Sequence, residues 1–282
     1  MNTALNVQDS SRARSPKQDR LRTRYGPWAL VTGASDGIGR EIAAQLAEAG
    51  IHLILVARRR ELLETIALEL TQRSGVQVRT IAADLANRAE LERVVTETLE
   101  LEVGLLVAAA GFGTSGDFIR GDLEAEQAML EVNCASVLAL THHFAGRFAA
   151  RGRGGIVLMS SLLAFQGVPG AAHYAATKAY IQTLAEGLHL ELAPKGVQVL
   201  ASAPGPVNSG FAARANMKMG AALTPREVAQ GTLNALLRGR TTVRPGLLSM
   251  FLEASLALLP RGARATLMAQ VMRGMTRHQA RV

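Results

Sequence analysis

Short apolar runs alternate with amphipathic stretches along most of the chain. The amphipathic stretches place apolar residues on one helix face, as Ile38, Ile42, Leu46 and Ala49 show in "IGREIAAQLAEAG". Strands separated by helices of 10 to 20 residues, without Asn-Gly hairpins, indicate βαβ units and a parallel sheet. The pattern predicts one doubly wound, Rossmann-like α/β domain over residues 25–245. Strands are expected at 28–33, 52–58, 76–85, 103–111, 155–161 and 197–205, and helices at 38–50, 60–75, 88–101, 123–148 and 174–193.

Both ends of the chain differ from this body. Residues 1–24 are polar, charged and without periodicity, which predicts a disordered basic extension. Residues 246–282 are apolar and Met-rich with arginines around them, and we expect a helical segment there. This segment either closes the core or a subunit interface, or it lies on a membrane surface with arginines at the headgroups. Glu253, inside the apolar part, argues against deep insertion.

Composition and charge narrow the class of protein. Hydrophobic residues make up 48% of the 282, and only 4% are aromatic, which suits a parallel sheet under helices. The single cysteine, Cys134, excludes an internal disulfide and fits a reducing, cytoplasmic compartment. The net charge of +8 is concentrated at the two ends, and the body between them is close to neutral. A nucleic-acid partner is therefore not expected, and a peripheral membrane contact is confined to residues 246–282.

A glycine-rich loop follows the first strand in "WALVTGASDGIGREIA". Gly33 allows a sharp turn, and Gly37 and Gly39 let the backbone approach a ligand and the sheet. A helix N-terminus in this position binds the pyrophosphate of a dinucleotide in doubly wound folds. The spacing is G-x3-G-x-G, so a plain tight turn is the alternative interpretation.

The second strand ends in "LVARRR" and offers no carboxylate for a ribose 2′-hydroxyl. A guanidinium from Arg58 or Arg59 can instead bind a 2′-phosphate, which predicts NADP(H) rather than NAD(H). Asp36 in the glycine loop weakens phosphate binding somewhat. Asp84, after the third strand, is placed either to accept from an adenine amino group or to cap a helix.

Reactive side chains gather in "SSLLAFQGVPGAAHYAATK". Tyr174 and Lys178 are four residues apart and share a helix face. Ser161 lies at the end of an apolar strand, where α/β sites are built. We expect the ammonium of Lys178 to lower the pKa of Tyr174, so that the phenol exchanges a proton with a carbonyl or alcohol oxygen. Ser161 would hold the same oxygen by a hydrogen bond. The sequence shows no metal site.

Together these motifs resemble the short-chain dehydrogenase/reductase family over residues 26–245. "TGASDGIG" is similar to its T-G-x3-G-x-G motif, "YAATK" to Y-x3-K, and "SAPGPV" to the P-G motif after the sixth strand. The resemblance implies a catalytic set of Asn133, Ser161, Tyr174 and Lys178, in which Asn133 supports a water relay to Lys178. It also implies cofactor contacts from Thr32, Gly33, Ser35, Asp36, Gly37, Ile38, Gly39, Arg58, Arg59, Asp84, Leu85, Ala110, Gly111, Tyr174, Lys178, Pro204, Gly205 and Val207.

The family usually has N-N-A-G after the fourth strand, whereas this chain has Ala108 to Gly111, "AAAG". Altered cofactor binding is expected there, not loss of chemistry. "SDGIG" with "ARR" also resembles the NADPH-dependent 3-oxoacyl and 17β-hydroxysteroid reductases. We therefore expect an oxidoreductase that moves a hydride between NADP(H) and a carbonyl or secondary alcohol, working as a homodimer or homotetramer. A cofactor-sensing protein and a membrane-surface adaptor are the alternatives. An apolar, lipophilic substrate is expected from Phe112, Leu162, Leu163, Phe165, Phe211 and Met217.

Overall fold

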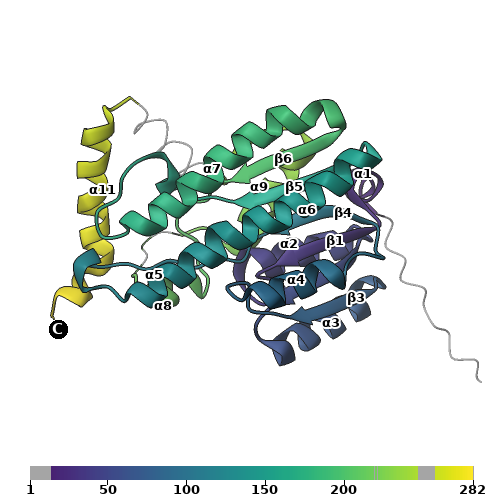
Figure 1. Ribbon diagram of the computed structural model, residues 1–282, viewed down its shortest axis with the longest axis horizontal. Coiled ribbons are helices and arrows are strands. Elements are labelled where there is room, and N and C mark those ends of the chain that lie inside the picture. Colours follow the sequence, from purple (N-terminus) through teal and green to yellow (C-terminus); the bar gives the residue numbers. More distant parts are fainter. Residues whose placement is uncertain (1–13, 219, 221, 247–257, 282) are drawn as a thin grey trace, which may run out of the picture.

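The computed structural model describes residues 14–218, 220, 222–246 and 258–281 (Figure 1). One parallel sheet runs through it, in the order β3-β2-β1-β4-β5-β6-β7. The doubly wound fold predicted from the sequence is confirmed, and all six expected strands are present. The short edge strand β7 was not predicted. The strands are β1 Trp28–Thr32, β2 His52–Ala57, β3 Val78–Ala82, β4 Val103–Ala108, β5 Gly154–Met159, β6 Val197–Ser202 and β7 Thr242–Val243.

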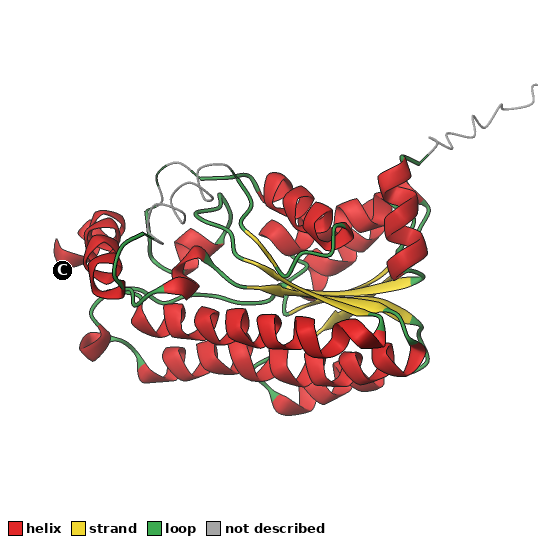
Figure 2. Cartoon of the chain, turned by 90° about the horizontal axis from the view of Figure 1, so that it is seen from above, coloured by secondary structure: helices red, strands yellow, loops and turns green. Residues whose placement is uncertain are grey.

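Helices cover both faces of the sheet (Figure 2). Strands β1, β4, β5 and β6 are buried along their whole length, which explains why they read as continuous apolar runs. Two large buried clusters lie on opposite faces of the sheet and contain apolar residues from different helices. One face is covered by α2 (Gly37–Glu48), α3 (Arg60–Ser74) and α9 (Pro225–Leu237), and the other by α4 (Arg88–Thr96), α6 (Ser136–Arg151) and α7 (Ala172–Leu192).

The predicted disordered extension is wrong for its last nine residues, 16–24. Pro16–Tyr25 form helix α1, which begins with a capping box between Ser15 and Gln18. The Tyr25 ring is fully buried, and its hydroxyl donates to Gln198 Oε1 at 2.8 Å. Any side chain on Gly155 would collide with that ring, so the helix is part of the core. Residues 1–13 lie outside the described residues.

The expected helix over 123–148 is divided into two. Helix α5 (Leu123–Leu130) passes into a π-helical turn, Glu131–Ala135, before α6 begins at Ser136. A π-turn inserts one residue into the helix and shifts the side chains that follow. Asn133 lies in this turn and is buried, so the irregularity falls on a predicted catalytic residue.

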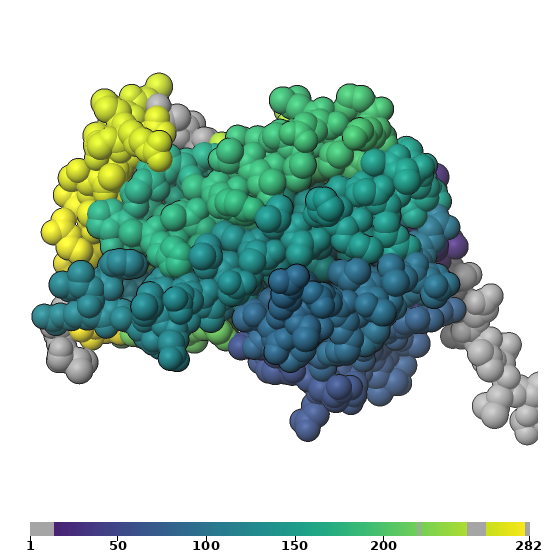
Figure 3. All heavy atoms as spheres, viewed as in Figure 1, coloured from purple at the N-terminus to yellow at the C-terminus, as the bar shows by residue number. Residues whose placement is uncertain are grey.

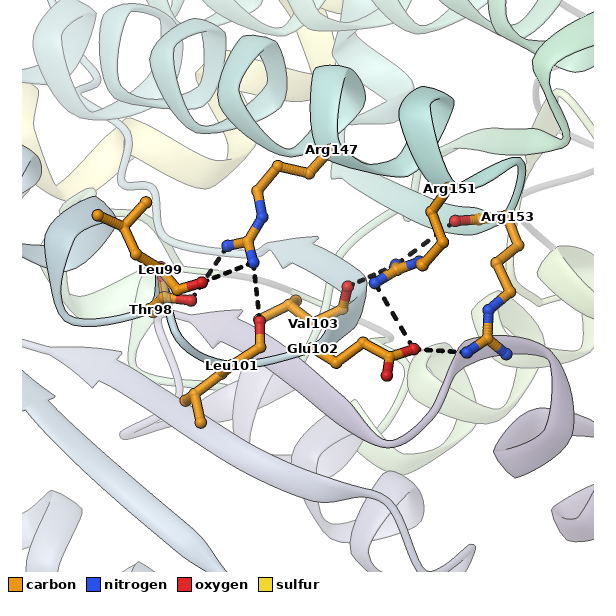
Figure 4. Close-up of polar contacts among 8 residues, drawn as sticks. All are labelled: Thr98, Leu99, Leu101, Glu102, Val103, Arg147, Arg151 and Arg153. Atoms are coloured by element: carbon orange, nitrogen blue, oxygen red, sulfur yellow. Dashed lines mark hydrogen bonds and ion pairs between the residues drawn. The ribbon is translucent and has the colours of Figure 1, made fainter.

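Two arginines of α6 hold the segment that enters β4 (Figure 4). The Arg147 guanidinium donates to the carbonyls of Thr98, Leu99 and Leu101 at 2.9 to 3.0 Å. Arg151 donates to the carbonyl of Val103 at 2.7 Å. Carbonyls at the end of a helix have no partner inside it. These arginines supply hydrogen bonds to the carbonyls of the segment that follows α4.

A third apolar cluster lies apart from the two main ones and contains Met129, Tyr174, Met217, Met268 and Met272. Helix α11 (Arg261–Thr276) supplies the last two of these. It stands at one end of the molecule, drawn yellow in Figures 1 and 3. The remaining helical turns are α8 Phe211–Arg214, η1 Phe118–Arg120, η3 Leu162–Phe165, η4 Ala193–Lys195 and η5 Arg277–Arg281.

The C-terminal segment is thus helical from Arg261 to Arg281, and residues 247–257 lie outside the described residues. Met268 and Met272 are buried against the body, which favours the closing role expected as one alternative. No described helix combines the length and the apolar character needed to cross a membrane.

Candidate active site

Most of the sequence-predicted site residues line one cavity of about 780 Å³. It contains the glycine loop, the segments that follow β2 to β6, and the reactive part of α7. Parallel α/β sheets bind their ligands at the carboxyl ends of the strands, near the point where strand order reverses. Here that point lies between β1 and β4. Predicted residues that line the cavity are Gly33, Ser35, Asp36, Gly37, Ile38, Gly39, Arg58, Arg59, Asp84, Leu85, Ala110, Gly111, Phe112, Ser161, Leu162, Leu163, Tyr174, Lys178, Pro204, Gly205, Val207, Phe211 and Met217.

Three predicted residues lie behind the wall of the cavity. Thr32 is buried and its hydroxyl accepts from the Ala110 N–H at 3.0 Å, so it supports the loop after β4. Asn133 is also buried beneath the cavity. Phe165 does not line the cavity and instead lies under the Arg244 guanidinium, 4.6 Å from its ring centre. The expectation that Phe165 lines the substrate side is therefore wrong.

The glycine loop has the shape expected of a phosphate cradle. Gly33 and Gly37 have φ angles of +64° and +54°, which side chains rarely adopt. A Cβ on Gly39 would collide with the Gly33 carbonyl, so helix α2 approaches the strand as closely as glycine permits. The first N–H groups of α2 have no carbonyl partner within their helix and point toward its N-terminus. The loop therefore fits an anionic group of a dinucleotide.

Asp36 ties the glycine loop to the segment after β6. Its carboxylate accepts from the Gly37 N–H at 2.7 Å and from the Gly210 N–H at 3.2 Å. Both carboxylate oxygens thus accept hydrogen bonds from backbone N–H groups. These bonds reduce the repulsion between Asp36 and a phosphate that the sequence predicted. The contact also brings the chain after β6 over the glycine loop.

The charged residues around the cavity favour an anion. Among the described lining residues, four are basic and two are acidic. Arg59 donates to Ser35 Oγ at 3.1 Å, which fixes it beside the glycine loop. Asp84 accepts from the Ala86 N–H, while Asn87 caps helix α4. The helix-cap alternative for Asp84 is therefore wrong. The basic members are Arg58, Arg59, Lys178 and Arg214, and the acidic ones are Asp36 and Asp84.

The predicted reactive residues meet at one place. Tyr174 and Lys178 lie one turn apart on α7, and Ser161 follows β5; all three are buried. The Lys178 Nζ lies 5.8 Å from the Tyr174 ring centre and donates to the Met159 carbonyl at 2.8 Å. A phenol, a hydroxyl and an amine are thus held on one wall of the cavity.

Burial sets the pKa values of this pair. It raises the pKa of Tyr174 to about 12, and hydrogen bonding by Ser161 opposes that rise. Burial also lowers the pKa of Lys178 to about 8. The Tyr174 pKa is thus raised and not lowered as expected, because loss of water around the phenol outweighs the hydrogen bond with Ser161. The phenol is therefore protonated at neutral pH.

Asn133 anchors the loop that departs from the family pattern. Its Oδ1 accepts from the Phe112 N–H at 3.1 Å, and its Nδ2 donates to the Phe112 carbonyl at 2.9 Å. A Cβ on Gly111 would lie 2.9 Å from Asn133 Oδ1 and 3.4 Å from Lys178 Nζ. Thr32 thus holds the "AAAG" segment at Ala110, and Asn133 holds Phe112, the residue that follows it. The expected alteration of cofactor binding there stays a prediction.

The sequence missed a wall of the cavity that comes from helix α11. Phe112, Leu163, Phe211 and Met217 form the predicted apolar side, and the Phe211 ring lies 5.3 Å from the Tyr174 ring. The apolar, Met-rich pattern of the C-terminal segment was the available signal, but it did not indicate what the segment covers. The C-terminal residues that line the cavity are Leu259, Leu267, Met268, Val271, Met272 and Met275.

Across the part of the chain that the structure describes, no three His, Cys, Asp or Glu side chains are grouped to hold an ion.

Comparison with known proteins agrees with this geometry. The short chain dehydrogenase family model matches residues 27–220. The chain belongs to the short-chain dehydrogenase family. It is therefore an oxidoreductase that uses NAD(P) and acts on CH–OH or C=O groups, near the hydroxysteroid and 3-oxoacyl reductase branch.

Several members of the short-chain dehydrogenase family are similar to this one. A 7β-hydroxysteroid dehydrogenase of Clostridium sardiniense is 35% identical over 180 residues, which is 64% of this chain and 69% of the relative. A very-long-chain 3-oxoacyl-CoA reductase of Podospora anserina is 37% identical over 62% of this chain and 53% of its own length. The solved structure of a short-chain dehydrogenase from Sphingobium yanoikuyae in complex with NADPH has 32% identity and a TM-score of 0.78, covering 86% of this chain and 95% of its own.

Proposed function

We propose that this short-chain dehydrogenase uses NADP(H) to interconvert a bulky, lipophilic ketone and its secondary alcohol. The observation that carries the proposal is one cavity that has basic and glycine-rich walls at one side and an apolar wall around Tyr174 at the other. Relatives named for hydroxysteroids and very-long-chain 3-oxoacyl-CoA support the lipophilic substrate. The NADPH complex of a similar structure supports the cofactor.

Each reactive residue of the cavity has a separate role in reduction of the ketone. The bound nicotinamide would supply the hydride that the carbonyl carbon receives. Ser161 holds the carbonyl oxygen by a hydrogen bond, and Tyr174 donates its phenolic proton to that oxygen as it becomes an alcohol. Lys178 contributes an amine whose lowered pKa of about 8 allows it to gain or lose a proton near neutral pH. Oxidation of the alcohol uses the same groups in reverse.

Cofactor oxidation against a panel of carbonyls tests this proposal. The panel contains steroid ketones, 3-oxoacyl thioesters, quinones and small aldehydes, each assayed with NADPH and with NADH. We expect turnover with a large apolar ketone and a preference for NADPH. Best turnover of a small polar substrate would contradict the lipophilic site. Tight NADPH binding without turnover of any carbonyl would favour a cofactor-sensing role.

Replacing Met272 by glutamine tests the contribution of helix α11. Met272 is buried and lines the cavity, so the amide would leave polar atoms against apolar neighbours. Burying an unpaired amide costs about 1 to 3 kcal/mol, and we expect kcat/KM for a large ketone to fall about tenfold. Small ketones should change little, and NADPH affinity should be unchanged.

The control for that variant is Thr266→Gln, an exposed position on the same helix that does not line the cavity. Equal losses for large and small ketones would mean that α11 supports the fold and does not contact the substrate.

A homo-oligomer is part of this proposal and has support from helices α6 and α7. Their outer faces expose Leu138 and Tyr180 at 45% and 40%, with alanines and glycines beside them. Such apolar faces are suited to packing against a second copy. In sedimentation velocity we expect a dimer or tetramer, shifted toward monomer by Leu138→Glu. A monomeric wild type would reject this part of the proposal.

The membrane-surface alternative rests on helix α11 and the residues just before it. Leu258, before the helix, and Leu267 and Val271, within it, are exposed at 87%, 42% and 47%. However, Leu267 and Val271 also line the cavity, which gives their side chains a role without a membrane. Peripheral membrane contact therefore stays a prediction, and vesicle sedimentation of the full chain would test it.

A further inference from the structure

An arginine that the sequence did not single out, Arg214, lines the cavity as an exposed side chain from the segment after β6. Arg214 is the last residue of α8, and its guanidinium carbon lies 4.0 Å from the centre of the Phe112 ring. Arginine stacks well on aromatic faces, and such contacts fix the direction of a long side chain. Within the described residues, no carboxylate lies within ion-pair distance of this guanidinium. Its donors are therefore left to water or to a ligand.

Arg214 connects segments that follow different strands of the sheet. Its own segment follows β6, while its stacking partner Phe112 follows β4. The charges of Arg58, after β2, and Asp84, after β3, also act on it. The guanidinium is therefore within electrostatic reach of residues that follow β2 and β3, where the adenosine half of a dinucleotide is expected.

The electrostatics at this place favour a negatively charged ligand. Burial lowers the pKa of Arg214, the nearby Arg58 lowers it further, and Asp84 acts in the opposite direction. Two guanidinium groups that repel each other in one cavity are stabilised by an anion between them. The carboxylate of Asp36 does not fill this role, because two backbone N–H groups already bind it.

We propose that Arg214 binds a phosphate group of the NADP(H) cofactor and so fastens α8 over the active site. This inference rests on the proposed use of NADP(H). Phosphate oxygens match the donor fork of a guanidinium, and the ring of Phe112 presents that fork along the cavity. Because Phe211 on the same short helix packs against Tyr174, cofactor binding by Arg214 also positions the cover of the reactive phenol. Arg214 is a binding residue here, distinct from the arginines at the end of β2.

Calorimetric titration of NADPH, NADH and ADP-ribose into the wild type and Arg214→Gln tests the inference. Losing a charge-assisted hydrogen bond should weaken binding of the phosphate-bearing ligand about tenfold. If only NADPH is weakened, Arg214 binds the 2′-phosphate. If all three are weakened equally, it binds the pyrophosphate. Arg88→Gln, a change at a 91% exposed side chain on α4, controls for the loss of one positive charge.

Hydrogen exchange gives a second readout that does not depend on affinity alone. Saturating NADPH should slow exchange in residues 208–218 of the wild type, and much less in saturated Arg214→Gln. If Arg214→Gln binds all three ligands as tightly as the wild type and shows the same protection with NADPH, the inference is overturned, while NADP(H) use stands. Failure of the wild type to bind NADPH would instead reject the proposed cofactor. Unchanged cofactor binding with a raised KM only for acidic substrates would reassign Arg214 to the substrate and overturn the inference.

Discussion

Replacing Tyr174 by phenylalanine is expected to lower kcat for ketone reduction about 1,000-fold. Positioned proton transfer contributes roughly 100- to 10,000-fold in enzymes, and the phenol is the donor at this site. Burial keeps the pKa of Tyr174 at about 12, so the wild-type group is protonated throughout the neutral range and can donate. The variant keeps the ring, which packs on Phe211, and loses only the hydroxyl.

Two measurements make this result specific. The variant should bind NADPH with the wild-type dissociation constant and unfold at a similar temperature, because the ring contacts are retained. Tyr180→Phe provides the matched control, since Tyr180 lies on the same helix with 40% of its surface exposed. If Tyr174→Phe keeps more than a tenth of the wild-type kcat, the proton comes from another group. Ser161 would then be the first candidate, because it follows β5 at the same wall.

Much of the sheet and the reactive set could be predicted from the sequence, because both follow local patterns. Strands β1 and β4 are buried on both faces, so they appear as continuous apolar runs. Tyr174 and Lys178 are four residues apart, and a helix places such residues on one face. The glycine loop is also local, because its φ angles and close contacts require glycine at defined positions.

Features that depend on contacts between distant segments were missed. Helix α1 was overlooked although "SPKQ" contains both halves of a capping box, because its charged residues conceal Leu21 and Tyr25. Nothing local indicates that Tyr25 fills the space left by Gly155. The π-turn around Asn133 was hidden in a continuous helical pattern. These elements are fixed by packing, which overrides local preference.

The same reason explains why the apolar wall of α11 could not be assigned. An apolar, Met-rich stretch shows that a face is buried but not what it covers. In the structure, Met268 and Met272 pack in one cluster with Met129, Tyr174 and Met217. The expected lowering of the Tyr174 pKa by the Lys178 ammonium failed for a related reason. How deeply the phenol is buried is decided only by the folded chain, and this burial raises its pKa.

Replacing Lys178 by methionine is expected to abolish turnover and yet to stabilise the folded protein. Lys178 is buried, and its pKa falls from 10.5 to about 8 because burial disfavours the ammonium. That difference corresponds to about 3 kcal/mol of cost when the group is charged in both folded and unfolded chains. Losing the hydrogen bond to the Met159 carbonyl lowers the stability of the variant by about 1 kcal/mol and so offsets part of this gain. At pH 7 the free energy of unfolding of the variant should therefore be about 2 kcal/mol larger than that of the wild type.

The pH dependence of this difference identifies its cause. Below pH 8 the lysine is protonated in both states, so the wild type bears the whole cost of burial. Between about pH 8 and 10.5 the folded wild type binds fewer protons at this site than the unfolded chain, so its stability rises with pH. The advantage of the variant should shrink over that interval, as measured by urea unfolding from pH 6.5 to 9.5. Lys195→Met, at an exposed lysine, should show no such trend. A variant less stable than the wild type at pH 7 would mean that the Lys178 ammonium stabilises the fold, and that burial is not the dominant influence on it.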